Sequence, residues 1–332
     1  MRRTQASSSA RRISLGFLAV TLLAAGCTSA AGSTAASGGT SITVAVIPGT
    51  DTAPVMIAAK DGLFRDHGLD VAVKTYNSLQ SEVQALKNGS VDIAAGDYAD
   101  FFYEDAAGKA SLHLIADGYD ATSNVMEVLS LPGSGITTPQ ELAHKVVATP
   151  EPQLIPSGNS VPYSMETLAT QSVLNSDGVS PTDVTWQPTS AKDMIPELRS
   201  GQVSAIVATE PTITEAESEL GAVEVMDSCS GQTAGLPLSG YFSLAAYASA
   251  HRAQLQQFRL ALASAQANAS TGGSLQAMLP HLTGMTRQNA ALVTLGSYPT
   301  SLSVGQVQRV ADLMLDSGVI STTLSVSKLA SS

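Results

Sequence analysis

The strongest constraint on the fold is an alternation of short apolar runs with segments of helical spacing. Residues 42–47 form a β-branched run closed by Pro48-Gly49, which predicts a buried strand. A helix is expected directly afterwards, because Pro54 suits a first turn and Gly62 supplies a stop. The same pattern predicts strands at residues 69–75, 91–95 and 112–116 and a helix at 81–87. Long crossovers between strands favour an α/β domain with a largely parallel sheet.

A second α/β unit is expected after residues 127–131. Thr138 and Glu141 have the spacing of a capping box, and Ser190 and Asp193 repeat it, although Pro196 should kink or weaken the second helix. From residue 251 onward the spacing of the apolar residues predicts a chain that is mostly helical. The strands predicted in this unit are 127–131, 146–148, 184–186, 203–208 and 222–226, and its helices are 162–175, 190–199 and 212–220.

Composition narrows the class of protein. The chain has 332 residues and is 44% hydrophobic, so it is too apolar for a disordered chain and long enough for two domains. Lys and Arg number 17 against 28 Asp and Glu, a formal charge of −11, which argues against a nucleic-acid partner. Two cysteines cannot build a disulfide framework.

Residues 1–26 have the features of an export signal rather than of a folded segment. Four arginines, at positions 2, 3, 11 and 12, precede an apolar run at 13–25 that is too short to span a bilayer. The run ends in Leu-Ala-Ala-Gly-Cys, which resembles the lipobox of bacterial lipoprotein signal peptides. We therefore expect cleavage before Cys27 and acylation of that cysteine, for example with palmitate. An ordinary signal peptide with an incidental Cys27 is the alternative, and the sequence leaves general-secretory or twin-arginine export open.

Removal of the leader makes the protein more acidic. It takes away four positive charges, which leaves 13 basic against 28 acidic residues and a formal charge of −15. Residues 27–40 contain only small and polar residues after the cysteine, so they are expected to form a flexible, lipid-anchored linker. Acyl chains on Cys27 would hold the protein on the extracytoplasmic face of the bacterial cell membrane.

Several stretches together resemble a known family. They read Ile-Thr-Val-Ala-Val-Ile-Pro at 42–48, Ala-Ala-Lys-Asp-Gly-Leu-Phe at 58–64, Ala-Leu-Lys-Asn-Gly-Ser-Val-Asp-Ile at 85–93, and Thr-Glu-Pro at 209–211. Their order and spacing are similar to the periplasmic solute-binding proteins of ABC importers, in the group for nitrate, sulfonates, taurine and thiamine precursors. Ser204, where the family usually has Asp, and Pro196 depart from the pattern.

The resemblance implies a type II periplasmic-binding-protein fold of two α/β lobes with the ligand in the cleft between them. Lobe 1 would comprise residues 41–127 and 229–332, and lobe 2 residues 128–228, with crossings near 123–129 and 228–244. Capture of a small organic solute by hinge closure is then expected, followed by delivery to a membrane permease and its ATPase. We expect a monomer that carries no cofactor and no metal and catalyses no reaction.

Loops that follow strands supply the predicted ligand contacts, because open α/β sheets bind ligands beyond the carboxyl ends of their strands. The family places its contacts on the same loops. Asp51, Thr52 and Ser160 could equally serve as helix caps. The predicted ligand-binding residues are Thr50, Asp51, Thr52, Asp97, Tyr98, Glu151, Ser160, Tyr163 and Glu210.

The charge of these loops suggests the ligand. They carry Asp51, Asp97, Glu151 and Glu210, whereas none of the ten arginines falls in them. We therefore expect a neutral or cationic nitrogen-containing ligand, such as a thiamine-precursor pyrimidine, stacked on Tyr98 or Tyr163. A sulfonate, taurine or nitrate anion held by helix N-termini is the alternative.

An exported enzyme on the same fold is the competing class. Its nucleophile would be Cys229, a lone thiol once Cys27 is acylated, with His113 as the base. A small buried hydrophobic role for Cys229 is the favoured interpretation. The five histidines show no metal-binding spacing, and the sequence has no Gly-x-Ser-x-Gly, His-Glu-x-x-His or phosphate-loop motif.

Overall fold

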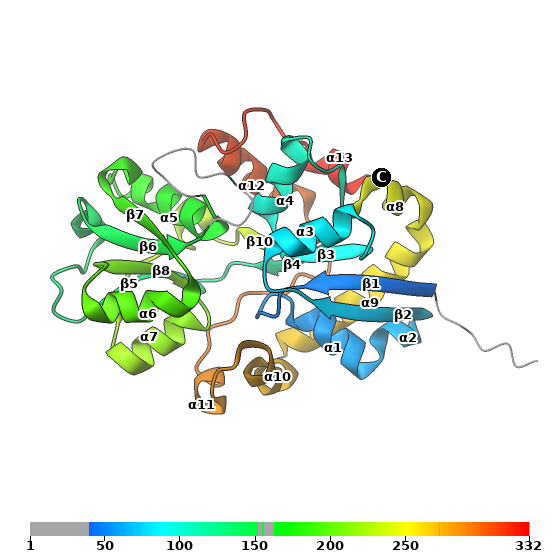
Figure 1. Ribbon diagram of the computed structural model, residues 1–332, viewed down its shortest axis with the longest axis horizontal. Coiled ribbons are helices and arrows are strands. Elements are labelled where there is room, and N and C mark those ends of the chain that lie inside the picture. The colour runs from blue at the N-terminus through cyan, green and yellow to red at the C-terminus, as the bar shows by residue number, and fades with distance from the viewer. Residues whose placement is uncertain (1–39, 152–154, 156–162, 272, 332) are drawn as a thin grey trace, which may run out of the picture. The chain divides into compact units, whose positions relative to one another are not determined.

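The computed structural model describes residues 40–151, 155, 163–271 and 273–331, and its strands form two five-stranded sheets (Figure 1). The first sheet has the order β2-β1-β3-β10-β4, and the second has the order β7-β6-β8-β5-β9. The first contains β1 (Thr40–Val46), β2 (Leu69–Thr75), β3 (Ile93–Asp97), β4 (Leu112–Asp120) and β10 (Pro237–Leu244). The second contains β5 (Met126–Ser130), β6 (Val146–Pro150), β7 (Thr185–Thr189), β8 (Ala205–Thr209) and β9 (Val223–Asp227).

Each sheet is mixed, with a single strand reversed. In the first sheet β1 pairs in parallel with β2 and β3, whereas β10 lies antiparallel between β3 and β4. In the second sheet β6 pairs in parallel with β7 and β8, whereas β5 lies antiparallel between β8 and β9. The reversed strands β5 and β10 are the ones that the chain enters as it passes from one sheet to the other. The predicted α/β class with two largely parallel sheets is confirmed.

Helices cover both faces of the first sheet (Figure 1). On one face Ile42 and Val44 of β1 pack with α1, α2 and α9, where Phe64 and Phe258 stack with ring centroids 5.2 Å apart. On the other face Ala45 and Ala94 pack with α3, α4 and α12. The helices that follow first-sheet strands are α1 (Ala53–Asp61), α2 (Leu63–Asp66), α3 (Leu79–Lys87), α4 (Tyr98–Ala106), α8 (Ala245–Ala250), α9 (Arg252–Ser270), α10 (Gly273–Thr283), α11 (Arg287–Ala290), α12 (Val304–Asp316) and α13 (Val326–Ala330).

The second sheet is covered in the same way. Val128, Val147 and Val207 face α5 (Met165–Ser176), whereas Leu129 and Ile206 face α6 (Ala191–Ser200) and α7 (Thr212–Leu220). Strand residues that alternate between two covered faces explain the nearly continuous apolar runs in the sequence. Short 3₁₀ turns occur at Pro139–Leu142, Pro181–Asp183 and Gly231–Thr233, and the first of them has the predicted capping box of Thr138 and Glu141.

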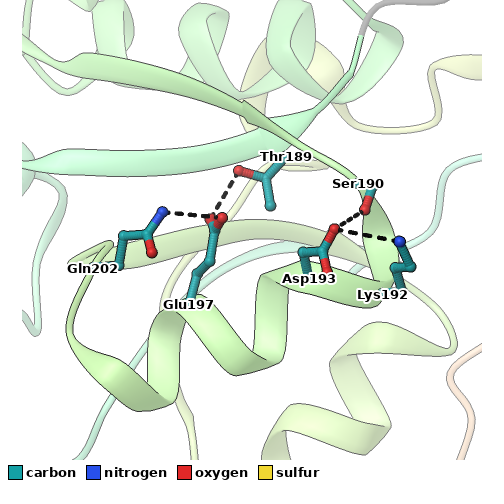
Figure 2. Close-up of polar contacts among 6 residues, drawn as sticks. All are labelled: Thr189, Ser190, Lys192, Asp193, Glu197 and Gln202. Atoms are coloured by element: carbon teal, nitrogen blue, oxygen red, sulfur yellow. Dashed lines mark hydrogen bonds and ion pairs between the residues drawn. The ribbon is translucent and has the colours of Figure 1, made fainter.

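One sequence prediction about α6 is wrong. Ser190 does not cap the helix through a backbone N–H; its hydroxyl donates to the carboxylate of Asp193, which also lies 3.9 Å from the Lys192 ammonium (Figure 2). Pro196 lies inside the helix, which continues to Ser200. The carboxylate of Glu197 accepts hydrogen bonds from Thr189 at 3.0 Å and from Gln202 at 3.1 Å, so it ties the end of β7 to the end of α6 (Figure 2).

Helix α4 and strand β10 are among the elements that the sequence did not predict. Helix α4 begins at Tyr98, immediately after β3, in a stretch expected to be a polar loop. Strand β10 occupies residues expected to be a glycine-rich crossing, and it is buried along Pro237–Ser243. The chain passes between the sheets after Asp120 and again after Asp227. No helix in the described part of the chain is long and apolar enough to cross a membrane.

Candidate functional site

A cavity of about 250 Å³ lies where the carboxyl ends of strands from both sheets meet. The loop after β1 and the end of β3 line it from the first sheet, and the end of β8 and the first turn of α5 line it from the second. Open α/β sheets place ligands at this edge, because strand ends and helix N-termini converge there. The predicted residues Thr50, Asp51, Thr52, Asp97 and Glu210 all line this cavity.

The cavity is acidic. Asp51, Asp97, Glu166 and Glu210 line it, and its described lining contains no Lys, Arg or His. Burial raises the pKa of Asp51 to about 6, with the charge of Glu166 adding to the effect against hydrogen bonds that lower it. Burial also raises the pKa of Asp97 well above its usual range, and the neighbouring carboxylates raise it further. Four carboxyl groups around one small space favour positive charge there.

Hydrogen bonds between the Thr52 side chain and the backbone hold the Asp51 loop in place. The Thr52 hydroxyl accepts a hydrogen bond from the Gly49 N–H at 3.1 Å and donates to the Ile47 carbonyl at 2.8 Å. A Cβ atom on Gly49 would lie 2.7 Å from Asp51 Oδ1, so only glycine allows the carboxyl group to fold back over this turn. The Thr52 side chain therefore stabilises this turn and makes no capping bond to α1, and Thr52 also borders the cavity.

Glu210 is strongly hydrogen-bonded. Its Oε1 accepts from the Thr294 N–H at 3.1 Å and from the Thr214 hydroxyl at 2.9 Å, and its Oε2 accepts from the Thr214 N–H at 3.1 Å. Thr214 lies in the first turn of α7, so Glu210 satisfies the start of that helix. Burial raises the pKa of Glu210, and these hydrogen bonds oppose the rise. Glu210 thus borders the cavity as a fixed acceptor group.

Tyr119 is an aromatic wall of the cavity that the sequence did not reveal. It lies at the end of β4 and packs against Tyr298, with ring centroids 5.1 Å apart. The Tyr298 hydroxyl donates to the Thr50 carbonyl at 2.7 Å, and the Tyr119 hydroxyl accepts from the Gly296 N–H. Sequence reasoning also missed Met165, Glu166, Leu238 and Ser239, because α5 begins later than predicted and β10 was not predicted.

Tyr98 does not lie in a polar loop, as the sequence predicted. It is fully buried in the core of the first sheet, and its hydroxyl donates to Asp117 Oδ1 at 2.8 Å. A helix that starts directly after β3 turns the ring away from the cavity and against Phe102 and Phe242. The proposed stacking of a ligand on Tyr98 is therefore wrong.

The remaining predicted residues lie elsewhere. The Tyr163 hydroxyl donates to the Ser317 carbonyl at 3.1 Å, and Glu151 is exposed; neither lines the cavity. Ser160 and Cys27 fall outside the described residues.

Cys229 is not arranged as a nucleophile. It is 3% exposed and does not line the cavity, and burial next to Asp227 raises the pKa of its thiol to about 12. A thiol with a raised pKa is largely protonated and unreactive at neutral pH. His113, the base considered for it, lies at the start of β4, the opposite end of that strand from the cavity. Among the described residues, no group of three or more His, Cys, Asp or Glu could hold a metal ion.

Solved structures share this architecture at low sequence identity. The periplasmic aliphatic sulphonate-binding protein SsuA from Escherichia coli matches with a TM-score of 0.72 and 17% identity, over 88% of this chain and 97% of that one. The alkanesulfonate-binding protein SsuA from Xanthomonas axonopodis pv. citri, bound to MOPS, matches at 0.67 and 18%, over 87% and 97%. The desulfurization enzyme DSZB matches at 0.67 and 14%, over 88% and 96%.

Two mixed sheets joined by two crossings define the periplasmic-binding-protein fold, and the structural matches place this chain in that class. A match between its sequence and a family profile identifies its family. The profile of the NMT1-like family matches residues 35–274, and the chain belongs to that family. No protein with curated annotation matches the sequence significantly.

Proposed function

We propose that this protein is the solute-binding component of an ABC importer. It would capture a small organic solute between lobe 1 (41–127 and 229–332) and lobe 2 (128–228) by closure about the two crossings, and deliver it to a permease driven by an ATPase. The observation that carries the proposal is the cavity of about 250 Å³, which is built from strand ends and helix starts of both sheets. The matches to sulfonate-binding proteins support it.

The ligand we propose is a neutral or cationic nitrogen-containing molecule, such as a pyrimidine of the thiamine-precursor type. Four carboxyl groups line the cavity, and no basic side chain is among its described lining residues. Tyr119 supplies the aromatic face that was first assigned to Tyr98 or Tyr163. A cation over a tyrosine ring gains about 0.5–2 kcal/mol in addition to its attraction to carboxylates.

A sulfonate or a similar anion is the second candidate. It is favoured by the likeness to two proteins described as sulphonate-binding and alkanesulfonate-binding. The N-cap residue of α1, Thr52, and the first turn of α5 border the cavity, and helix N-termini attract anions. Against it, an anion would lie beside Asp51, whose pKa of about 6 leaves its carboxyl group largely ionised at neutral pH.

Thermal unfolding of the protein against a panel of amines, pyrimidines, flavins, taurine and alkanesulfonates tests both the function and the ligand. A ligand at 100 times its dissociation constant adds about 2.7 kcal/mol to the free energy of unfolding. We expect an amine or a pyrimidine to raise the midpoint temperature most. A larger rise with taurine or an alkanesulfonate would establish the second candidate, and a panel without any effect would count against the importer role.

A charge-removing variant makes the ligand assignment specific. Asp97→Asn should weaken binding of a cationic ligand by about tenfold, because Asp97 lines the cavity and a bound cation would stabilise its ionised form against the groups that raise its pKa. Asp97 makes no side-chain capping bond to α4, so the substitution leaves that helix start intact. The control is Asp70→Asn, which removes an equal charge from an exposed position on β2. Equal effects of the two substitutions would contradict a carboxylate contact at Asp97.

We also propose that Cys27 carries the lipid that holds the protein at the extracytoplasmic face of the membrane, and that the protein acts as a monomer without catalysis of its own. The sequence from residue 23 to Cys27 supports the anchor. Burial of Cys229 and the raised pKa of its thiol weigh against the alternative of a cysteine-dependent enzyme. Mass spectrometry of the membrane-bound form would reveal the acylated cysteine.

A further inference from the structure

A second pocket, of about 400 Å³, has the opposite charge to the first. Arg252, Gln256 and Arg259 of α9 line it together with His113 of β4, and its described lining contains no carboxylate. Neither arginine makes an ion pair or a side-chain hydrogen bond with any other described residue. Two unpaired guanidinium groups at one pocket are unusual in a chain with 28 acidic residues.

The start of α9 forms part of the same pocket. Arg252 and Ala253 are its first two residues, and the preceding His251 makes no side-chain capping bond. The first turn contains no acidic residue. The leading N–H groups of this 19-residue helix therefore keep their capacity to donate, and the helix dipole adds positive potential beside the arginines.

The arginines supply the charge of the pocket. Burial lowers the pKa of His113, and the positive charges of Arg259 and Arg252 lower it further, against a backbone hydrogen bond at Leu329 that raises it. Because both arginines line the same pocket as His113, their charges lie close together on this side of β4. Gln256 lies one turn after Arg252 on α9 and adds a neutral donor to the pocket.

We propose that this pocket binds a phosphate-type oxyanion. A tetrahedral anion can accept paired hydrogen bonds from a guanidinium group and single bonds from backbone N–H groups at a helix start, and the pocket offers both kinds of donor. The pocket lies at the end of the first sheet opposite the solute cavity, because β4 runs in the same direction as β1 and His113 is near its beginning. The proposal is therefore independent of the solute-binding function.

The anion has two possible sources. Free phosphate is one, and the head group of an anionic phospholipid is the other. Strand β1 begins at Thr40 at the same end of the sheet as the start of β4, so the first described residue lies at the end of the sheet that carries the pocket. The same donors fit both sources, and the experiment must distinguish them.

Calorimetric titration of the full chain at constant ionic strength, with chloride as the balancing ion, tests the proposal. The probes are inorganic phosphate and dihexanoylphosphatidylglycerol below its micelle-forming concentration, with dihexanoylphosphatidylcholine as the zwitterionic comparison. Binding of phosphate alone identifies a site for the free ion. Binding of phosphate and of the phosphatidylglycerol, but not of the phosphatidylcholine, identifies a head-group site. Either result supports the oxyanion pocket, and no binding of either anion overturns it.

A matched pair of variants locates the binding. The double substitution Arg252→Gln and Arg259→Gln should weaken binding of whichever anion binds by at least about tenfold, since charged donors are lost while side-chain length is nearly kept. Arg287→Gln, at an exposed position on α11, should leave it unchanged. Both arginines of the pocket are exposed, so the double variant should unfold at the wild-type temperature. Unchanged anion binding in the double variant would overturn the assignment.

Discussion

Glu82 is a buried carboxyl group that the sequence did not single out. Its side chain is 0% exposed, Oε1 accepts from the Ala95 N–H at 2.9 Å, and Oε2 has no hydrogen-bond partner among the described residues. Its pKa is raised to about 8, mainly by burial and in small part by the charge of Asp51, and the Ala95 hydrogen bond opposes the rise. Ala95 lines the solute cavity, so Glu82 supports the wall of the site from behind.

Stability should therefore fall as the pH rises. A carboxyl group with a raised pKa binds its proton more tightly in the folded state than in the unfolded state, so its contribution is complete below about pH 4.5 and is lost as the pH rises through about 8. Glu82→Gln stays neutral and keeps the acceptor for Ala95. At pH 9 the variant should exceed the wild type in free energy of unfolding by about 2 kcal/mol or more, and at pH 5 by little.

Urea unfolding at both pH values measures this difference. Glu219→Gln is the control, because Glu219 is an exposed partner of Arg199 and its removal should change the pH profile by only a few tenths of a kcal/mol, about the worth of a surface pair. Parallel pH profiles for the wild type and Glu82→Gln would show that Glu82 does not titrate in this range.

At the scale of single residues, the sequence located the loops of the site better than their side chains. Thr50, Asp51, Asp97 and Glu210 line the cavity because strand ends converge whatever their sequence. Tyr119 could not be located in the same way, since its place depends on β4 running past Ala116 to Asp120.

Helix α4 and strand β10 show why the sequence did not predict some helices and strands. Gly96, Asp97 and Asp100 have loop composition, yet β3 leads directly into α4 without intervening loop residues. In β10, Pro237, Ser239 and Gly240 have turn composition, yet the strand lies inside the sheet, between β3 and β4. Local propensity is overridden where a strand is buried on both faces, because burial in the sheet stabilises residues that a free strand would disfavour.

Position 240 requires glycine, because the backbone there packs directly against the ring of Tyr98. A Cβ atom there would lie 2.8 Å from Cζ and Oη of Tyr98, whose ring is fixed by its hydrogen bond to Asp117. Gly240→Ala should therefore lower the free energy of unfolding by about 1–3 kcal/mol, as overpacking of a core usually does. Chemical denaturation would measure the loss.

Gly305→Ala provides the matched comparison. Gly305 lies in the first turn of α12, and nothing lies within 4 Å of the position its Cβ would take. Alanine should be neutral there or stabilise by about 0.4–1 kcal/mol, since it restricts the unfolded chain. A loss at position 305 equal to that at position 240 would show that the effect does not arise from the contact with Tyr98.

Across the whole molecule, Glu210 links the two sheets. It follows β8 of the second sheet and accepts from Thr294, while the neighbouring Ser297 pairs with Asp120 at the end of β4 in the first sheet. Glu210→Ala should weaken solute binding by about tenfold, because the hydrogen bond between the two sides is lost. Calorimetric titration with the solute found in the panel measures it.

Thr214→Val is the control for that substitution. It removes the hydroxyl that donates to Glu210 but leaves the bond from Thr294 in place. Both variants should lose some stability at the start of α7, and only Glu210→Ala should lose affinity for the solute. Equal affinity losses would mean that the order of α7, rather than the link between the sheets, controls binding.

The reversed strand in each sheet has a consequence for synthesis on the ribosome. All strands of the second sheet lie between Met126 and Asp227, so that sheet can be complete as soon as this stretch has emerged. Strand β4 joins its sheet only through β10, which is made more than a hundred residues later. The edge of the first sheet at β4 therefore lacks its partner strand until β10 has been made, although the second sheet can already form.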